Sequence, residues 1–119
     1  MTLHNTQFGR QGEEIALDYL LKNKFEILVR NYRSKFGEID IVAQKENKIY
    51  FVEVKTRANL DKGMPYEAVD SHKKYQMKKA ATYFLLENDY QKFKFTLSVI
   101  SILFNNSGDF DLRFFENIY

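Results

Sequence analysis

The chain has 119 residues and a formal net charge of +2, with 45% hydrophobic and 29% charged residues. This balance excludes a disordered or membrane-embedded chain and predicts one folded domain over residues 1–119. The absence of cysteine excludes disulfide bonds and cysteine-based zinc or nucleophile chemistry. No apolar run is long enough to span a bilayer, and the amino-terminal stretch lacks the apolar centre of a signal peptide. We therefore expect a cytoplasmic protein with no membrane partner.

A helix and three strands are predicted in the first half of the chain. Apolar residues recur at helical spacing between residues 8 and 24, namely at Phe8, Ile15, Ala16, Tyr19 and Leu20. Strands are predicted where β-branched and aromatic residues gather, over residues 25–33, 37–44 and 48–57.

A loop and a second helix follow the third strand. The loop covers residues 58–67 and contains glycine and proline. The helix begins at Asp70 or Ser71, both favourable N-cap residues, and ends near Glu87. Its inward side is expected to carry Val69, Gln76, Ala80 and Phe84.

Two more strands complete the predicted fold. Residues 93–104 are almost uncharged, which is typical of a strand buried on both faces, and residues 110–115 form a last strand expected at an edge. The order helix, three strands, helix, two strands predicts an α/β (α+β) fold. Its central mixed sheet would have about five strands, flanked by helices.

The hairpin formed by the second and third strands carries unusual charges. A two-residue turn at 46–47 would pair Lys45 with Lys48 and, further along, Asp40 with Glu53 and Glu38 with Lys55. Strand alternation puts Glu53 and Lys55 on one face of the third strand. On the second strand it groups Glu38, Asp40 and Val42 on one face and Ile39, Ile41 and Ala43 on the other.

Two carboxylates at opposed positions need an explanation. Their Cβ atoms would lie ~5 Å apart, and like charges there cost roughly 0.2–1 kcal/mol. A divalent cation between them would reverse the sign, because Mg²⁺ favours one or two carboxylates together with water and phosphate oxygens. The alternative is a solvated charged face, which is common in hairpins.

The two helices add a third carboxylate and a group of cations. Glu13 lies at the border of the first helix's apolar stripe and can reach a neighbouring strand, or can lie there without a role, whereas Glu14 points to solvent. On the second helix, Lys73 and Gln76 project near the inward side and can reach a phosphate or a metal-bound water, whereas Lys74, Lys78 and Lys79 are expected to be solvated.

Basic residues near the hairpin suggest a surface for a nucleic-acid backbone. Arg33, Arg57, Lys73 and Gln76, together with Arg30 and Lys35, would form a rim that contacts phosphates without reading sequence. The overall charge of +2 permits such binding but does not require it.

Five short segments, in this order and spacing, resemble the motifs of one protein family. They are GRQGEEIA from Gly9, NYR from Asn31, GEID from Gly37, FVEVKTR from Phe51 and AVDSHKK from Ala68. The chain thereby resembles the bacterial YraN family, whose members are expected to be endonucleases. That family is similar to the archaeal Holliday-junction resolvases of the restriction-endonuclease-like superfamily, whose signature is PD-(D/E)xK.

The resemblance implies a restriction-endonuclease-like fold and a set of site residues. Asp40 and the Glu53-x-Lys55 unit would occupy the catalytic positions, and Glu13 matches the additional helix glutamate of the resolvase-like branch. Ile39 stands where the signature has proline. Because that proline is not a metal ligand, the departure affects the written motif more than the chemistry.

The implied reaction is hydrolysis of phosphodiester bonds in DNA with the help of Mg²⁺ or Mn²⁺. Asp40 and Glu53, with the backbone carbonyl of Val54, would bind the ion, and Glu13 would ligate the same ion or a second one. Lys55 would orient or deprotonate the attacking water.

Three functions stay open at this point. The first is a metal-dependent nuclease acting on DNA, with branched or structured DNA among its substrates. The second is a catalytically inactive nuclease-like module that binds nucleic acid, and the third is a protein-interaction domain with a charged surface hairpin. A homodimer is one open oligomeric state, since junction resolvases act as dimers and the last strand carries aromatic residues.

Overall fold

The computed structural model describes residues 3–118, with side chains from Gly9 onward. The elements are α1 (Leu3–Lys22), β1 (Glu26–Ser34), β2 (Gly37–Lys45), β3 (Lys48–Arg57), the 3-10 helix η1 (Pro65–Ala68), α2 (Ser71–Glu87), β4 (Lys94–Phe104) and β5 (Phe110–Phe115). The predicted order of helices and strands is confirmed. Two details differ: α1 begins earlier than predicted, and η1 forms within and just after the expected loop. The Phe8 side chain lies outside the described side chains.

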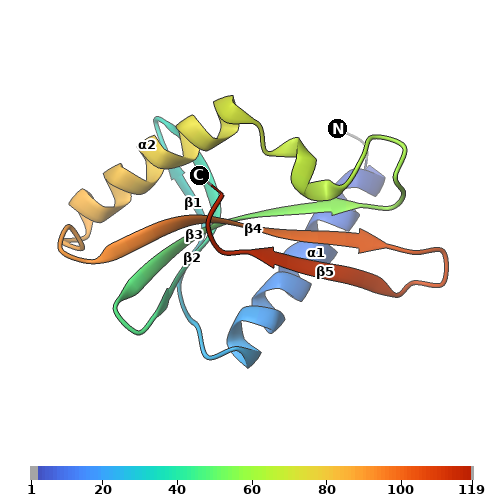
Figure 1. Ribbon diagram of the computed structural model, residues 1–119, viewed down its shortest axis with the longest axis horizontal. Helices are drawn as coiled ribbons and strands as arrows, with labels where there is room; N and C mark the ends of the chain where they lie inside the picture. The colour runs from blue at the N-terminus through green and yellow to red at the C-terminus, as the bar shows by residue number, and fades with distance from the viewer. Residues whose placement is uncertain (1–2, 119) are drawn as a thin grey trace.

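The sheet has five strands in the order β1-β2-β3-β4-β5 and is mixed. Strands β3 and β4 are parallel, and the other neighbours are antiparallel. A parallel pair needs a crossover connection, which α2 supplies, whereas the antiparallel pairs are joined by short turns. This is the α+β arrangement predicted from the order of elements (Figure 1).

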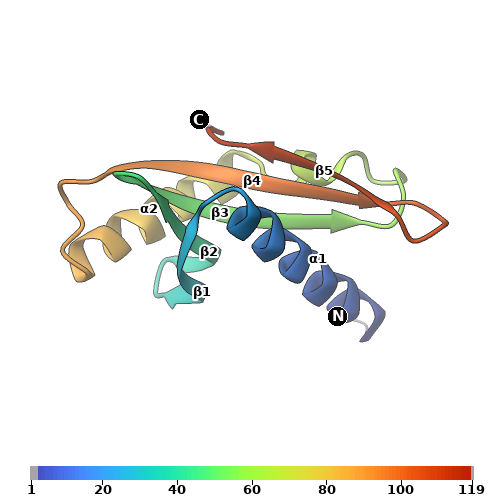
Figure 2. The same ribbon diagram turned by 90° about the horizontal axis from the view of Figure 1, so that it is seen from below.

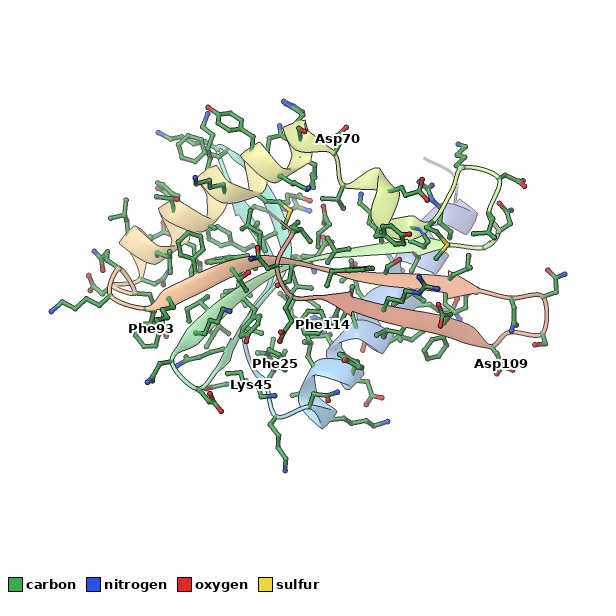
Figure 3. All side chains as sticks on the ribbon, viewed as in Figure 1. Phe25, Lys45, Asp70, Phe93, Asp109 and Phe114 are labelled. Atoms are coloured by element: carbon green, nitrogen blue, oxygen red, sulfur yellow. The ribbon has the colours of Figure 1, made fainter. Side chains whose placement is uncertain are left out.

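The two helices cover opposite faces of the sheet, so the core has two layers of contacts (Figure 2). On one face, Ala16, Leu17 and Leu20 of α1 pack against Val52 and Ile100. Figure 3 shows Phe25, Phe114 and Lys45 close together near the carboxyl end of α1. The rings of Phe25 and Phe114 are 5.9 Å apart, and the Lys45 ammonium lies 5.0 Å from the centre of the Phe25 ring.

On the other face, Met77, Ala80 and Phe84 of α2 pack against Phe51 and Leu97. The predicted inward side of α2 is therefore wrong at one position, since Met77 is buried and Gln76 is only partly buried. A hydrophobic side chain one residue away takes the core position, because burial favours methionine over glutamine.

Strand β4 is interior and almost fully buried, and β5 forms an edge of the sheet, as predicted. After β5 the chain turns back over β4, where Thr96 and Ser98 donate hydrogen bonds to the carbonyl of Glu116 at 2.8 and 2.7 Å. Within residues 3–118, neither helix is long and apolar enough to cross a bilayer.

The crossing of α1 over β3 depends on a glycine. A Cβ added to Gly12 would collide with Thr56 Cγ2, whereas a Cβ added to Gly9 meets no heavy atom within 4 Å outside its own stretch of helix in the described part of the chain. Thr56 is β-branched and rotates little, so the collision is not easily relieved. The helix therefore lies close enough to β3 for the next residue, Glu13, to approach the strand.

Alanine substitutions at the two glycines are expected to change stability in opposite directions. Gly12→Ala should lower the free energy of unfolding by about 1–3 kcal/mol through overpacking. Gly9→Ala should raise it by about 0.5–1 kcal/mol, because alanine favours the helix over the unfolded chain. Urea unfolding of both variants under one buffer condition checks this, and a shift in the same direction for both would contradict it.

Candidate functional site

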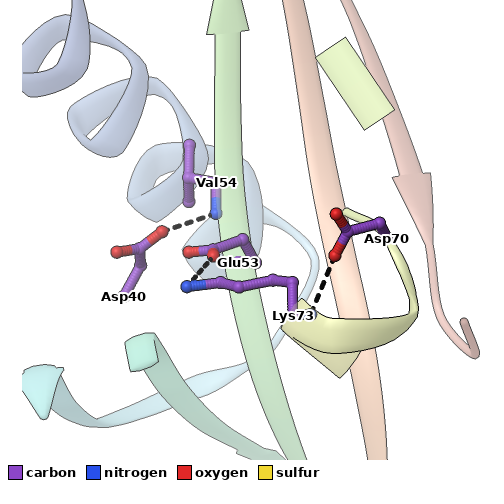
Figure 4. Close-up of polar contacts among 5 residues, drawn as sticks. All are labelled: Asp40, Glu53, Val54, Asp70 and Lys73. Atoms are coloured by element: carbon purple, nitrogen blue, oxygen red, sulfur yellow. Dashed lines mark hydrogen bonds and ion pairs between the residues drawn. The ribbon is translucent and has the colours of Figure 1, made fainter. Parts of the chain in front are cut away.

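The hairpin between β2 and β3 brings the candidate site together. Its observed register runs from Lys45 opposite Lys48 to Ile41 opposite Val52, which confirms the predicted two-residue turn. The regular pairing ends there, one position before Asp40. Instead, the Val54 N–H donates to Asp40 Oδ2 at 2.8 Å (Figure 4). The aspartate side chain thus replaces a backbone acceptor at the point where the ladder opens.

A distortion of β1 accompanies this opening. Asn31 lies between the pairs that β1 and β2 form at Arg30 with Ile41 and at Tyr32 with Ile39, and so faces Asp40. Asn31 has a φ of 53°, in the left-handed region that asparagine tolerates better than most residues.

The same distortion breaks the alternation of side chains along β2. Ile39 packs on the α2 face and Ile41 on the α1 face, although they are two residues apart. The prediction that Ile39 and Ile41 share a face is therefore wrong. The cause is the local change in backbone direction, which also frees the Asp40 carboxylate from an ordinary strand position.

Asp40, which is partly buried, and Glu53, which is buried, form a carboxylate pair. Glu53 is only 5% exposed. Burial raises the pKa of Asp40 to about 8, and the side-chain hydrogen bond with Glu53 and the charge of Glu53 act in the same direction. For Glu53, burial acts to raise the pKa, but the hydrogen bonds with Asp40 and Lys73 and the charges of Lys73 and Lys55 outweigh it and lower the pKa. The opposite pKa shifts favour a proton on Asp40 and a negative charge on Glu53.

Lys73 of α2 neutralises the ionised member of the pair. Its ammonium lies 2.7 Å from Glu53 Oε2, with side-chain exposures of 29% for Lys73 and 6% for Glu53. Asp70 caps α2 by accepting the Lys73 N–H at 2.9 Å, as predicted for an N-cap, and so fixes the first turn of the helix beside β3 (Figure 4). Burial would lower the pKa of Lys73, but the hydrogen bond and charge of Glu53 raise it overall.

Lys55 and Glu38 do not form the contact predicted for them. Glu38 pairs with Arg33 instead, at 2.9 Å on the surface, because β2 has left the β3 ladder at this point and keeps its pairing with β1. Lys55 is half-buried on β3, two residues after Glu53, and its charge helps to lower the pKa of Glu53.

Glu13 approaches the pair from α1 on the far side of β3. Burial raises the pKa of its carboxyl, and the charges of Glu14, Glu53 and Glu38 raise it further, whereas Arg30 lowers it. Glu14 is exposed and bound to Arg30 at 2.7 Å, in agreement with its predicted solvated position. Among the described residues, no group of three or more acidic, histidine or cysteine side chains is gathered for a metal ion. The core of the candidate site is therefore Asp40 with Glu53.

Four residues of the predicted basic rim, Arg33, Arg57, Lys73 and Gln76, lie in different surroundings. Lys73 touches the carboxylate pair, and Gln76 lies on the next turn of α2, beside the backbone of Gly37. Arg33 is occupied by Glu38 at the surface. Arg57 is at the end of β3, and its Nε is buried without a hydrogen-bond partner in the described structure. This guanidinium group therefore has one donor that no acceptor of the described residues satisfies.

Two features of the site were not expected from the sequence. One is the Val54 N–H that binds Asp40, and the other is the left-handed Asn31 opposite it. The signal for the second was present, since asparagine in the middle of a strand is unfavourable and indicates an irregular backbone.

Comparison with known proteins agrees with the motifs in the sequence. The model of the uncharacterised protein family UPF0102 matches residues 12–102. A UPF0102 protein of Dictyoglomus thermophilum is 42% identical over 106 residues, covering 89% of this chain and 90% of the relative. Relatives from Clostridium acetobutylicum and Clostridium tetani are 38% and 37% identical, over 97% and 100% of this chain and 95% and 98% of their own lengths.

The matched region contains the whole carboxylate pair, both neighbouring lysines and the N-cap of α2. The matches extend over nearly the full length of the relatives, so the likeness is not confined to one motif. The chain belongs to the UPF0102 family, also called the YraN family.

Proposed function

We propose that this protein is a metal-dependent nuclease that hydrolyses phosphodiester bonds of DNA, with branched or structured DNA among its substrates. The observation that carries the proposal is the contact between two carboxylates on neighbouring strands, the partly buried Asp40 and the buried Glu53. Burying such a pair is unfavourable for stability unless it is compensated. The raised pKa of Asp40, which favours its neutral form, and the ammonium of Lys73 beside Glu53 provide such compensation.

The donor set fits a Mg²⁺ or Mn²⁺ ion. Asp40 and Glu53 would hold the ion, because Mg²⁺ is commonly bound by one or two carboxylates together with substrate phosphate oxygens. Glu13 is close enough for its charge to act on Asp40 and would contribute from α1. When bound, a divalent cation supplies Lewis acidity and neutralises charge on the phosphate.

The remaining chemistry is assigned to residues of β3. Lys55 would orient the attacking water and take part in its proton transfer, since it lies beside the pair and is half-buried. Arg57, at the end of β3, would contact a phosphate next to the scissile one through its guanidinium group. These contacts engage only the backbone of the nucleic acid, so they predict cleavage without sequence preference.

One observation favours a second candidate, a nuclease-like module that binds nucleic acid without cutting it. Lys73 already neutralises Glu53 at 2.7 Å, so the site is electrostatically balanced without a metal ion. A chain that had lost turnover would keep this ion pair and its basic surroundings. The two candidates differ in whether Mn²⁺ competes successfully with Lys73 for Glu53.

Cleavage of a panel of DNA substrates tests the proposal. Purified protein is incubated with linear, nicked, flapped and four-way DNA in Mg²⁺, Mn²⁺ or EDTA. We expect metal-dependent cleavage of at least one substrate, and a loss of more than about 100-fold in Glu53→Ala because a direct ligand is removed. Glu14→Ala is the matched control, since Glu14 is an exposed glutamate bound to Arg30.

Two results would decide against the nuclease. One is no cleavage of any substrate by wild type, with Mn²⁺ binding retained, which would favour the binding module. The other is equal cleavage by wild type and Glu53→Ala. Calorimetric titration with Mn²⁺ completes the test, because failure to bind Mn²⁺ through Asp40 and Glu53 would exclude a metal site altogether.

A further inference from the structure

The outer side of α2 forms an apolar groove with the turn between β1 and β2. In Figure 1 this turn passes behind α2. The groove, here called the α2 groove, has a volume of about 460 Å³ and is lined by Phe36, Tyr75, Lys78, Lys79, Thr82, Tyr83 and Leu86. Phe36 also packs against the core on the α2 face, whereas the carboxylate pair is formed without any of the lining residues.

Aromatic rings dominate the groove and are unusually accessible. Tyr75 is 59% exposed and Tyr83 38%. Phe36 packs edge-on against Tyr83, with ring centres 5.8 Å apart, so the two rings hold each other in place. Exposed apolar surface of this kind on a small domain commonly marks a binding site.

Lysine side chains lie over these rings. The Lys79 ammonium is 4.8 Å from the centre of the Tyr75 ring and 5.3 Å from that of Phe36. Lys35 lies 5.3 Å from the Phe36 ring on the same turn. None of the seven residues that line the groove is acidic. The α2 groove therefore combines flat aromatic faces with positive charge and attracts an anion that also carries flat rings.

Unpaired nucleotides have this combination of properties. Their phosphates are attracted by lysines, and their bases stack on aromatic side chains because every base has a flat face. Paired bases inside a duplex do not offer those faces. The alternative ligand, an apolar peptide, would gain nothing from the lysines, so charge complementarity favours the nucleic acid.

One strand of a substrate can span the separation along α2 between the carboxylate pair and the far part of the α2 groove. Lys73 touches Glu53 at the start of α2, and Tyr83 lies ten residues further along the same helix. This separation corresponds to about 15 Å along the helix axis. A stacked strand advances about 3.4 Å per nucleotide, so about four nucleotides cover the distance.

We infer that the α2 groove binds a single-stranded segment of the substrate, a few nucleotides from the phosphate held at Asp40 and Glu53. The preferred substrate class is then DNA with unpaired nucleotides next to a duplex, such as a flap, a tail or an open junction. This inference rests on the proposed function only in taking nucleic acid as the ligand. Binding by the α2 groove requires neither metal nor cleavage.

Binding measured in EDTA, where no cleavage is expected, tests the inference. Fluorescence anisotropy compares a blunt DNA duplex, the same duplex with a ten-nucleotide dT tail, and single-stranded dT. We expect the tail to tighten binding by wild type about tenfold or more, as stacking of one or two bases allows. Tyr75→Ala should remove most of that gain, and Tyr75→Phe should keep it, because the ring rather than the hydroxyl stacks.

Matched variants separate stacking from general effects. Phe110→Ala removes an aromatic residue that is 47% exposed on β5, away from the α2 groove, and should leave tail binding unchanged. Lys79→Gln should weaken binding of the tail, whereas Lys24→Gln, at an exposed lysine after α1, should not. Tyr75 is exposed, so its replacement is expected to leave the melting temperature within about 2 °C of wild type.

The outcomes distinguish this inference from the nuclease proposal. A tail that gives no gain in affinity, or a gain that survives both Tyr75→Ala and Tyr83→Ala, overturns the inference and points to a protein ligand instead. Tail binding that depends on Tyr75, in a protein that cuts none of the DNA substrates, supports the inference and rejects the nuclease. An equal preference for a uridine tail in RNA would keep the stacking mode and widen the ligand to RNA.

Discussion

Replacing Lys55 by methionine is expected to slow DNA cleavage by about 10²–10⁴-fold while leaving the fold intact. Replacing Lys73 by methionine is expected to lower the stability of the fold and to have a smaller effect on cleavage. The factor is the one expected for Lys55 in its proposed role in proton transfer. Lys55 is half-buried and forms no ion pair within the described residues, so its loss leaves no charge without a partner. Cleavage rates under saturating Mn²⁺ and thermal melts give the two readouts.

Lys73→Met removes the counter-ion of a buried carboxylate. Breaking a fully buried ion pair costs roughly 3–5 kcal/mol. Because Lys73 keeps 29% exposure, we expect a smaller loss of about 2–3 kcal/mol. For a chain of this length that corresponds to a fall of roughly 8–15 °C in melting temperature. Mn²⁺ at about 100 times its dissociation constant should restore about 2.7 kcal/mol, because the ion replaces the lost charge.

Lys74→Met is the matched control for the substitution in α2. Lys74 is the next residue of the helix and forms no ion pair in the described structure, so its replacement should have little effect on melting. If Lys73→Met is as stable as Lys74→Met in EDTA, the ion pair contributes nothing. If Lys73→Met lowers cleavage as much as Lys55→Met at equal stability, the roles of the two lysines are not separate.

Asp40→Asn is expected to stabilise the metal-free protein by several degrees at pH 8. Asparagine carries no charge, can accept the Val54 N–H as Asp40 does, and can donate to Glu53 as the protonated carboxyl does. The substitution therefore keeps both contacts and removes the charge repulsion. In Mn²⁺ the wild type should melt at a higher temperature than Asp40→Asn, because the wild type gains metal-binding energy that the variant lacks.

The pH dependence of this difference has a definite sign. The pKa of Asp40 is about 8 in the folded chain and near 3.8 in the unfolded one. A raised carboxyl pKa contributes stability that is complete below the unfolded value and is lost as pH rises through the folded value. In EDTA, the gain in stability of Asp40→Asn over wild type should thus be small near pH 4, grow between about pH 4 and pH 8, and level off above about pH 8.

Thermal melts in EDTA at a series of pH values measure this difference. Asp18→Asn serves as the control, because Asp18 is exposed and pairs with Lys22 on the surface of α1. Surface pairs of this kind are worth less than about 1 kcal/mol, so a small loss at every pH above about 5 is expected. An Asp40→Asn variant that melts below wild type at all pH values would contradict the assignment of the proton to Asp40.

The hairpin shows how far the sequence alone leads. The register of β2 and β3 follows from a two-residue turn and from strand alternation, both of which are local. The prediction is confirmed from Lys45 opposite Lys48 to Ile41 opposite Val52, and the predicted ladder pairs of Asp40 with Glu53 and of Glu38 with Lys55 do not form. The N-cap at Asp70 was likewise predictable from one short segment. The predicted proximity of Asp40 and Glu53 depends only on this local geometry.

Other parts of the site depend on contacts between distant segments. The break at Asp40 lies opposite the left-handed Asn31 of β1, and two strands must be considered together to foresee it. The ion pair of Lys73 with Glu53 depends on how the loop after β3 returns α2 to the sheet. The sequence indicates that Lys73 lies near the inward side of the helix but not which group it meets there.

The parallel pairing of β3 with β4 has a consequence for the order of folding. Strands β1, β2 and β3 are joined by short turns, whereas β3 can pair with β4 only after residues 58–93 have been brought across. Closing a long segment costs more chain entropy than closing a turn, so the hairpins are expected to form first. Asp40 and Glu53 then meet before Lys73 arrives, and loss of Lys73 should speed unfolding more than it slows folding.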